Sequence, residues 1–106
     1  MTVLHGSIKG TADGWKFYGK FSEPGGPPLF AVEGGLDKPI HNLSVPHAEL
    51  VNGKVGSYAY EGQIGPEFLS IRSTSLPQVI VLGHLGSPIA PTHVAGWLQV
   101  VEVLRE

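Results

Sequence analysis

Short apolar segments separated by glycine- and proline-rich turns recur along the whole chain, and this spacing limits the folds it can adopt. The sequence contains 15 glycines and 9 prolines, residues that are typical of tight turns. Disordered chains also accumulate them, but such chains lack the apolar surface that offsets the entropy of ordering. Here 42% of the residues are hydrophobic, so we expect the turns to connect packed elements. About eight short strands with turns every eight to twelve residues are typical of a β-sandwich or a β-barrel.

The length of the chain sets how much core it can build. It has 106 residues and no cysteine, so one hydrophobic core has to stabilise it without disulfides. This is the size of one typical domain. We therefore predict a single all-β domain over residues 1–106, a small antiparallel sandwich or barrel of about eight short strands with at most one short helix.

Two alternating segments near the N-terminus predict the first hairpin. Residues 2–9 and 15–22 are joined by a short turn flanked by glycines, which is typical of antiparallel pairing. Side chains of a strand alternate between its two faces. In the second segment this alternation places Trp15, Phe17 and Phe21 on one face, which we expect to be buried.

The middle of the sequence admits two interpretations. Ser44 can cap the N-terminus of a short helix that ends at Asn52 and Gly53. Alternatively, residues 48–51 pair with the alternating segment 54–61 through an Asn-Gly hairpin turn. We favour the hairpin, because the second segment has clear strand periodicity.

The C-terminal segment 93–104 is also ambiguous between helix and strand. Five of its apolar residues lie at helical spacing, which suits an amphipathic helix: Val94, Trp97, Leu98, Val101 and Leu104. The segment is nevertheless rich in β-branched valines and is interrupted by Gly96, which favours a strand. We predict a long strand here, and a central strand over residues 78–82, where both faces are apolar.

Charge and hydropathy argue against two classes of partner. The formal net charge is −2 and the basic residues form no cluster, whereas nucleic-acid binding needs several basic side chains on phosphates. An anionic membrane surface has the same requirement.

No apolar run approaches the roughly 20 residues that cross a bilayer, and the N-terminal segment lacks the features of a signal peptide. We expect a soluble cytoplasmic protein; an exported domain with its signal removed is the other possibility.

Five histidines are many for this length, and imidazole is a common metal ligand. A metal site needs imidazoles that converge with a carboxylate or a further histidine. Neither His41 with His47 nor His84 with His93 has the i, i+4 spacing of helical zinc motifs. The glycine doublets also lack the spacing of a phosphate-binding loop. We therefore expect no metal and no cofactor.

Catalysis has little support in the sequence. No serine lies in a Gly-x-Ser-x-Gly elbow, and the linear spacing reveals no pair of glycosidase carboxylates. If the chain is an enzyme, a histidine and a carboxylate would act as acid and base. The first candidates for these catalytic roles are His84, His93 and Glu67.

Three tyrosines are the candidates for ligand binding. Tyr18 lies between Lys16 and Lys20 on the face opposite the predicted core, so we expect it to be exposed. Tyr58 and Tyr60 share one face of their strand. Aromatic side chains of this kind can stack on a ligand, or pair with neighbours across a solvated sheet face.

The lack of a catalytic motif and the glycine- and proline-rich scaffold favour a non-catalytic binding or assembly domain. We predict that it contacts its ligand or protein partner through the loops Glu23–Pro28 and His84–Thr92, because loops on a rigid scaffold often determine specificity, and through apolar strand surface. The alternative function is a small β-barrel enzyme with an apolar pocket and histidine/carboxylate acid–base chemistry.

The C-terminal segment also predicts self-association. As a strand, residues 97–104 would be apolar on both faces, and one face would need a cover. A second copy in a two-fold dimer is the simplest cover, with Val101 and Val103 at the interface. Other partners remain open: a higher homo-oligomer, a larger particle of which this chain is a structural subunit, another protein, or a small ligand.

Overall fold

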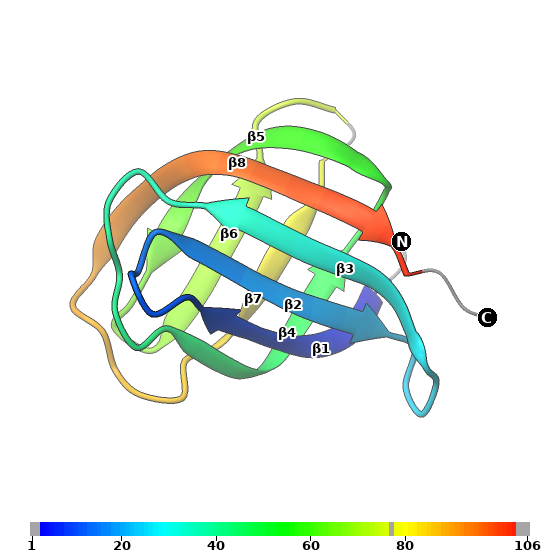
Figure 1. Cartoon of the computed structure of the whole chain (residues 1–106), viewed down its shortest axis with the longest axis horizontal. Coiled ribbons are helices and arrows are strands. Elements are labelled where there is room, and N and C mark those ends of the chain that lie inside the picture. Colours follow the sequence, from blue (N-terminus) through cyan, green and yellow to red (C-terminus); the bar gives the residue numbers. More distant parts are fainter. Residues whose placement is uncertain (1–2, 77, 104–106) are drawn as a thin grey trace.

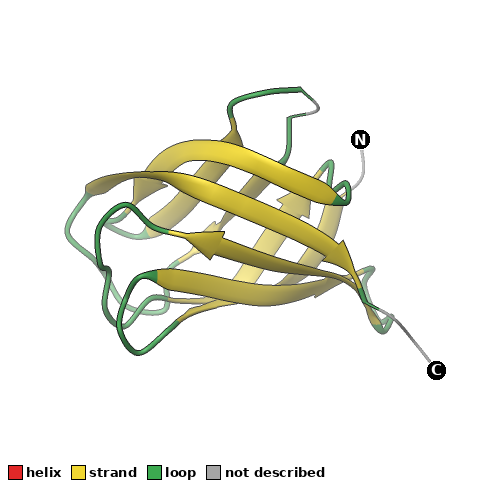
Figure 2. Ribbon diagram, turned by 45° about the horizontal axis from the view of Figure 1, so that its top comes forward, coloured by secondary structure: helices red, strands yellow, loops and turns green. Residues whose placement is uncertain are grey.

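The described residues, 3–76 and 78–103 of a computed structural model, form eight antiparallel strands that close into a barrel. Figures 1 and 2 show strands and connecting loops wrapped around one interior. The strands are β1 (Val3–Gly10), β2 (Lys16–Ser22), β3 (Pro28–Gly35), β4 (Ser44–Val51), β5 (Gly56–Ile64), β6 (Phe68–Ser73), β7 (Ile80–His84) and β8 (Thr92–Glu102). The predicted all-β fold is confirmed, and the architecture is the barrel. These residues contain no helix that could span a bilayer.

The strand order around the barrel combines local hairpins with long-range pairs. The order is β1-β2-β3-β8-β5-β6-β7-β4, and β4 pairs with β1 to close the wall. The predicted first hairpin is present as β1 and β2. The C-terminal strand β8 lies between β3 and β5, which are far apart in sequence. Closure gives each described strand two neighbours and leaves no open sheet edge among them.

Strand β4 corrects both interpretations of the middle segment. Ser44 begins a strand, so the short helix is wrong. The favoured hairpin between residues 48–51 and 54–61 is also wrong, because β4 pairs with β1 and β7 while β5 pairs with β6 and β8. Asn52 does adopt the left-handed conformation, with φ of 56°, as a turn residue can. The turn therefore bends the chain without pairing the two strands that flank it.

The prediction of a strand rather than a helix at the C-terminus is confirmed by β8, although Leu104 lies outside the described residues. Trp97, Gln99 and Val101 all face outward, as the predicted alternation requires. Val103 follows the end of the strand, and its backbone N–H donates to the carbonyl of Leu29. Strand β7, which contains most of the predicted central segment, lies between β4 and β6.

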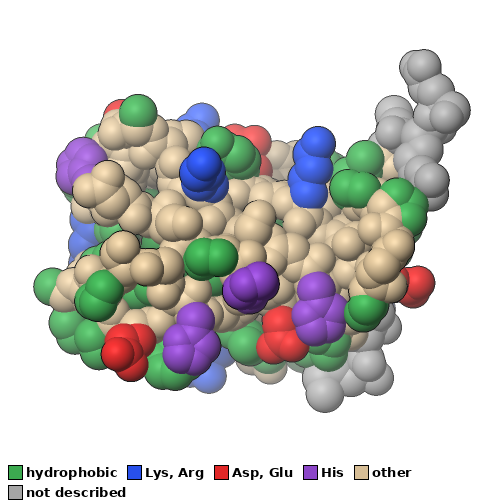
Figure 3. All heavy atoms as spheres, turned by 90° about the horizontal axis from the view of Figure 1, so that it is seen from below, with side chains coloured by type: hydrophobic (Ala, Val, Ile, Leu, Met, Phe, Trp, Pro, Cys, Tyr) green, Lys and Arg blue, Asp and Glu red, His purple; other side chains and the backbone are tan. Residues whose placement is uncertain are grey.

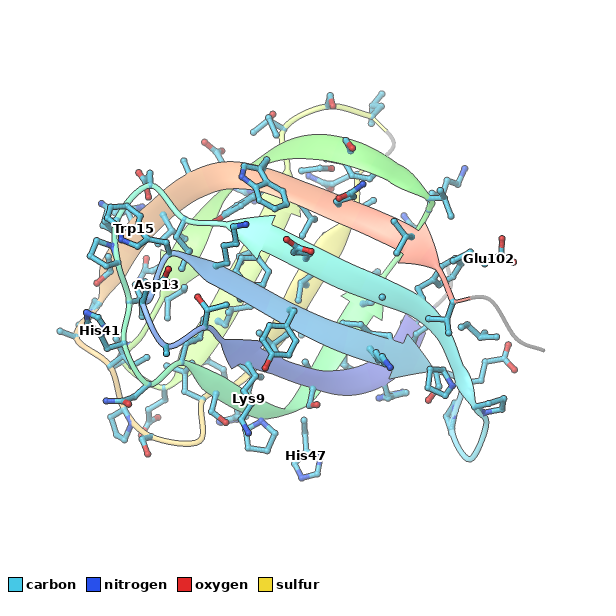
Figure 4. The ribbon with its side chains drawn as sticks, in the orientation of Figure 1. Lys9, Asp13, Trp15, His41, His47 and Glu102 are labelled. Atoms are coloured by element: carbon cyan, nitrogen blue, oxygen red, sulfur yellow. The ribbon has the colours of Figure 1, made fainter. Side chains whose placement is uncertain are left out.

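Large apolar side chains fill the interior of the barrel. The largest of the fully buried side chains are Tyr60, Phe17, Phe21, Ile8, Leu50, Ile64, Leu69, Ile71 and Leu98. Phe17 and Tyr60 contact each other edge to face, with ring centroids 6.1 Å apart. Trp15 was expected beside Phe17 in this core, and that expectation is wrong. It precedes the first residue of β2, lies at one end of the barrel (Figure 4), and is 47% exposed.

Two inward-facing glycines allow β1 and β2 to approach closely. A Cβ atom at Gly19 would collide with the carbonyl oxygen of Ser7, and one at Gly6 would collide with that of Lys20. The pairing of β1 with β4 also shifts register between Gly6 and Ile8. Glycines and bulges of this kind are what bend a sheet sharply enough to close a small barrel.

Candidate functional site

Because the interior is packed, the candidate sites lie on the outer wall. Three grooves stand out among the described residues. We call them the Tyr18 groove on β1, β2, β3 and β8, the histidine groove on β1, β4, β6 and β7, and the polar groove on β5, β6 and β8. Each is partly open to solvent, so a partner can reach its side chains from outside the barrel.

The Tyr18 groove has a volume of about 390 Å³ and a mainly apolar lining. Its side chains include Ser7, Lys9, Tyr18, Lys20, Ala31, Glu33, Gln99 and Val101. Strand register explains their arrangement. One row across the sheet runs Lys9, Tyr18, Glu33 and Gln99, and the next runs Ser7, Lys20, Ala31 and Val101. Tyr18 is 50% exposed and Val101 is 41% exposed. Two exposed apolar side chains and two lysines therefore share this part of the outer wall.

Of the lysines in and beside this groove, only some have a charged partner. Lys16 lies 4.0 Å from the carboxylate of Glu33 and 5.9 Å from the centre of the Trp97 ring. Neither Lys9 nor Lys20 forms an ion pair within the described part of the chain. The residues opposite Lys20 in the ladder are Ser7 and Ala31. Two lysines of the groove are therefore free to meet an external anion.

Of the other two tyrosines predicted to bind a ligand, Tyr60 belongs to the core and Tyr58 is partly buried against it. Tyr60 is only 2% exposed, and its hydroxyl donates a 2.7 Å hydrogen bond to the carbonyl of Gly35. Burial, with a smaller contribution from the charge of Asp37, raises the pKa of Tyr60 above its ordinary value. Tyr58 packs against the core and donates to the carbonyl of Lys54 at 2.7 Å. Of the three, Tyr18 is the one whose ring lines an exposed groove.

The histidine groove, of about 500 Å³, gathers residues that are distant in sequence. His47 lies opposite His84 in the ladder, and the His84 ring lies 4.3 Å from that of Phe68. His5 lies 3.9 Å from the carboxylate of Glu49. Figure 3 shows this face, where histidine side chains cluster beside acidic and hydrophobic ones. This grouping was not predicted from the sequence, because it depends on the pairing of β4 with β1 and β7.

The three proposed catalytic residues do not line one common groove. His84 lines the histidine groove, His93 lines the polar groove of about 770 Å³, and Glu67 lines neither. Glu67 instead contributes its backbone carbonyl, which accepts a hydrogen bond from Leu85. Within the described residues, no hydrogen bond or ion pair joins any two of these side chains.

The polar groove holds charged groups of both signs, with Glu61 on β5, Arg72 on β6, and Asp37 and Lys38 in the loop after β3. Glu61 lies opposite Arg72 in the β5–β6 ladder, and His93 lies opposite Gln63 in the β5–β8 ladder. At its rim Asp37 accepts a 3.1 Å hydrogen bond from the backbone N–H of Ala95. Among the described residues, no three histidine, aspartate or glutamate side chains are placed to hold a metal ion.

No protein-family model, curated protein or solved structure matches this chain. The choice among the three grooves therefore depends on their residues. The Tyr18 groove combines the exposed tyrosine predicted to bind a ligand with the outward face of β8 that was predicted to need a cover.

Proposed function

We propose that this chain is a non-catalytic binding or assembly domain that contacts its ligand or protein partner through the Tyr18 groove. The observation that supports it most directly is the exposure of Tyr18 beside Val101 on one face. Exposed aromatic side chains are effective anchors at interfaces, because they offer a large rigid area at low entropic cost. The aliphatic stems of Lys9 and Lys20 extend the apolar surface around them.

The packing of the barrel supports an external contact surface. Phe17, Phe21 and Tyr60 are fully buried and occupy the interior, where some barrels of this strand number hold a ligand. A partner then has to engage side chains on the outside of the wall. The outward residues of β2 and β8 are well suited to this, since a barrel wall holds them in fixed positions.

The two loops that were predicted to make contacts are less suited to forming one site. The loop that ends at Pro28 enters β3, whose Phe30 pairs with Glu102 at the end of β8. The loop after His84 instead leads into the beginning of β8. The two loops therefore lie at opposite ends of the barrel (Figure 1), and we assign the contact to the wall between them.

A fragment-binding experiment tests this proposal without knowledge of the natural partner. Two-dimensional NMR spectra of the labelled chain would be recorded with a set of aromatic and aliphatic fragments. We expect shift changes to centre on Tyr18, Ala31 and Val101, and to be lost in Tyr18→Ser. Fragment binding that maps to the polar groove, to the histidine groove or to a surface outside all three grooves would contradict the proposal.

A further inference from the structure

We propose that the Tyr18 groove binds an acidic protein segment, which inserts an apolar side chain against Tyr18 and Val101 and pairs carboxylates with Lys9 and Lys20. This inference rests on the proposed function and adds the chemistry of the partner. It follows from the charges of the groove, from the closure of the barrel, and from the symmetry that a second copy would impose.

The groove has an excess of positive charge on a chain whose net charge is negative. Its lining contains two lysines and one glutamate, while the formal charge of the whole chain is −2. The glutamate, Glu33, is already within 4.0 Å of Lys16. Two further carboxylates, Asp13 and Glu102, do not line the groove and lie at opposite ends of the barrel from each other (Figure 4). The local field therefore favours a partner that brings its own negative charges.

The spacing of the lysines fits a segment with an apolar residue between acidic ones. Lys9 lies directly opposite Tyr18 on the neighbouring strand, and Lys20 lies two residues along the same strand and face. Neighbouring positions of this kind are about 5–7 Å apart. A side chain packed on the Tyr18 ring would thus have a lysine on each of two sides. Carboxylates of the partner that flank this apolar side chain can reach both Lys9 and Lys20.

The partner has to bind through side chains rather than by adding a strand. Strand addition needs an unpaired sheet edge. In the described residues, β2 pairs with β1 and β3, and β8 pairs with β3 and β5. The backbone groups of this wall are therefore used within the barrel. Specificity then depends on the apolar anchor and on the two lysines.

A second copy of the chain is a poorer occupant of the same groove. A two-fold dimer places the same surface patch on both subunits. Each subunit would then bring the lysine excess of its own groove to the same interface, and like charges brought together at an interface are unfavourable. An acidic segment gains from these same charges, so it is the occupant that the groove favours over the homodimer predicted from the C-terminal segment.

Selection from a displayed library of random dodecapeptides against the full chain tests the partner chemistry. We expect selected peptides to be net negative, with at least one large apolar residue. A labelled synthetic copy should bind with an affinity that Tyr18→Ala lowers, and that the double change Lys9→Glu with Lys20→Glu lowers by about tenfold or more. The matched control is the double change Lys38→Glu with Lys54→Glu, which reverses the same number of exposed lysines outside the Tyr18 groove and should leave the affinity within about twofold.

The possible outcomes separate this inference from the proposed function. Neutral or basic peptides that still depend on Tyr18 would overturn the acidic partner and leave the binding function standing. Peptides whose binding is unaffected by Tyr18→Ala would overturn the acidic partner at this groove, and fragment mapping would decide the function independently. A dimer of the wild-type chain that Val101→Lys dissociates would show that a second copy occupies the groove, and would also overturn the inference.

Discussion

The hydroxyl of Tyr60 on β5 donates a 2.7 Å hydrogen bond to the carbonyl oxygen of Gly35 on β3. These strands are not neighbours, because β8 lies between them. The residue of β8 opposite Tyr60 is Gly96, and a Cβ atom there would collide with the Gly35 oxygen and approach the tyrosine ring to 3.3 Å. One buried side chain therefore links three strands that come from distant parts of the sequence.

Replacing Tyr60 by phenylalanine should lower the free energy of unfolding by about 1–2 kcal/mol, because the buried Gly35 carbonyl loses its partner. Urea denaturation monitored by tryptophan fluorescence measures this change. The matched control is Tyr58→Phe, whose hydrogen bond to the Lys54 carbonyl lies in an exposed position and should contribute less. Equal losses in the two variants would contradict the linking role of Tyr60.

The pKa of Tyr60, raised by burial, predicts a loss of stability in alkali. A tyrosine whose folded-state pKa exceeds its unfolded value of about 10 stabilises the fold fully below that value, and the contribution falls as the pH rises through the folded pKa. The stability difference between wild-type and Tyr60→Phe should therefore shrink from about pH 9.5 upward. A difference that stays constant to pH 11 would show that Tyr60 does not titrate in this way.

Substituting Gly96 by alanine should destabilise the barrel by about 1–3 kcal/mol or more, since the added methyl group meets a backbone carbonyl that cannot move easily. Thermal unfolding would report it. Gly86→Ala is the matched control, because its Cβ would meet its nearest atom, in Pro46, only at 3.4 Å, and its effect should stay within about 0.5 kcal/mol. A neutral Gly96→Ala would mean that β8 can shift away from β3.

Local patterns in the sequence were sufficient to predict which face of β2 is buried, but not which strands pair with β4. The alternation around Phe17 and Phe21 correctly predicted the buried face of β2, and it placed Tyr18 on the exposed one. The Asn-Gly pair after β4 correctly indicated a turn but not its strand partners. Pairing of β4 with β1 and β7 is decided by closure of the whole barrel, which no local pattern encodes.

The candidate site was predictable only in part for the same reason. Tyr18 and Val101 were each identified separately, from the alternation of their own strands. That they share one groove depends on β3 lying between β2 and β8. The burial of Tyr60 was not predicted, because its strand alternates tyrosines with small and polar residues, and such a pattern does not show which face is inside.

The turn between β1 and β2 contains a carboxylate whose titration can be checked. Asp13 accepts hydrogen bonds from the hydroxyl of Thr11 at 2.7 Å and from the backbone N–H of Trp15 at 3.1 Å. The hydroxyl first, and then the N–H, hold the pKa of Asp13 below its ordinary value. Carbon-detected NMR titration should show this lowering, and Thr11→Val should raise the pKa of Asp13 back toward its ordinary value.

The sign of the Asp13 effect on stability follows from that lowered pKa. A carboxylate with a depressed folded-state pKa stabilises the fold above its unfolded pKa, and the contribution is lost as the pH falls through the folded value. Asp13→Asn should therefore cause a loss of stability at neutral pH that shrinks as the pH falls through the lowered pKa of Asp13. An equal loss at pH 7 and at pH 2.5 would mean that the charge of Asp13 has no part in holding the turn.

Neighbouring residues Val100 and Val101 test which face of β8 forms the groove. Val100 is fully buried and Val101 is 41% exposed, because successive side chains of a strand point to opposite faces. Val100→Lys should abolish folding, since it buries an unpaired charge in the core. Val101→Lys should remain folded, with a change in stability within about 1 kcal/mol. Light scattering should give the same monomeric mass for wild-type and Val101→Lys, because the lysines of the groove oppose a second copy. If Val101→Lys unfolds as Val100→Lys does, the outward face of β8 belongs to a packed interior and is not a docking surface.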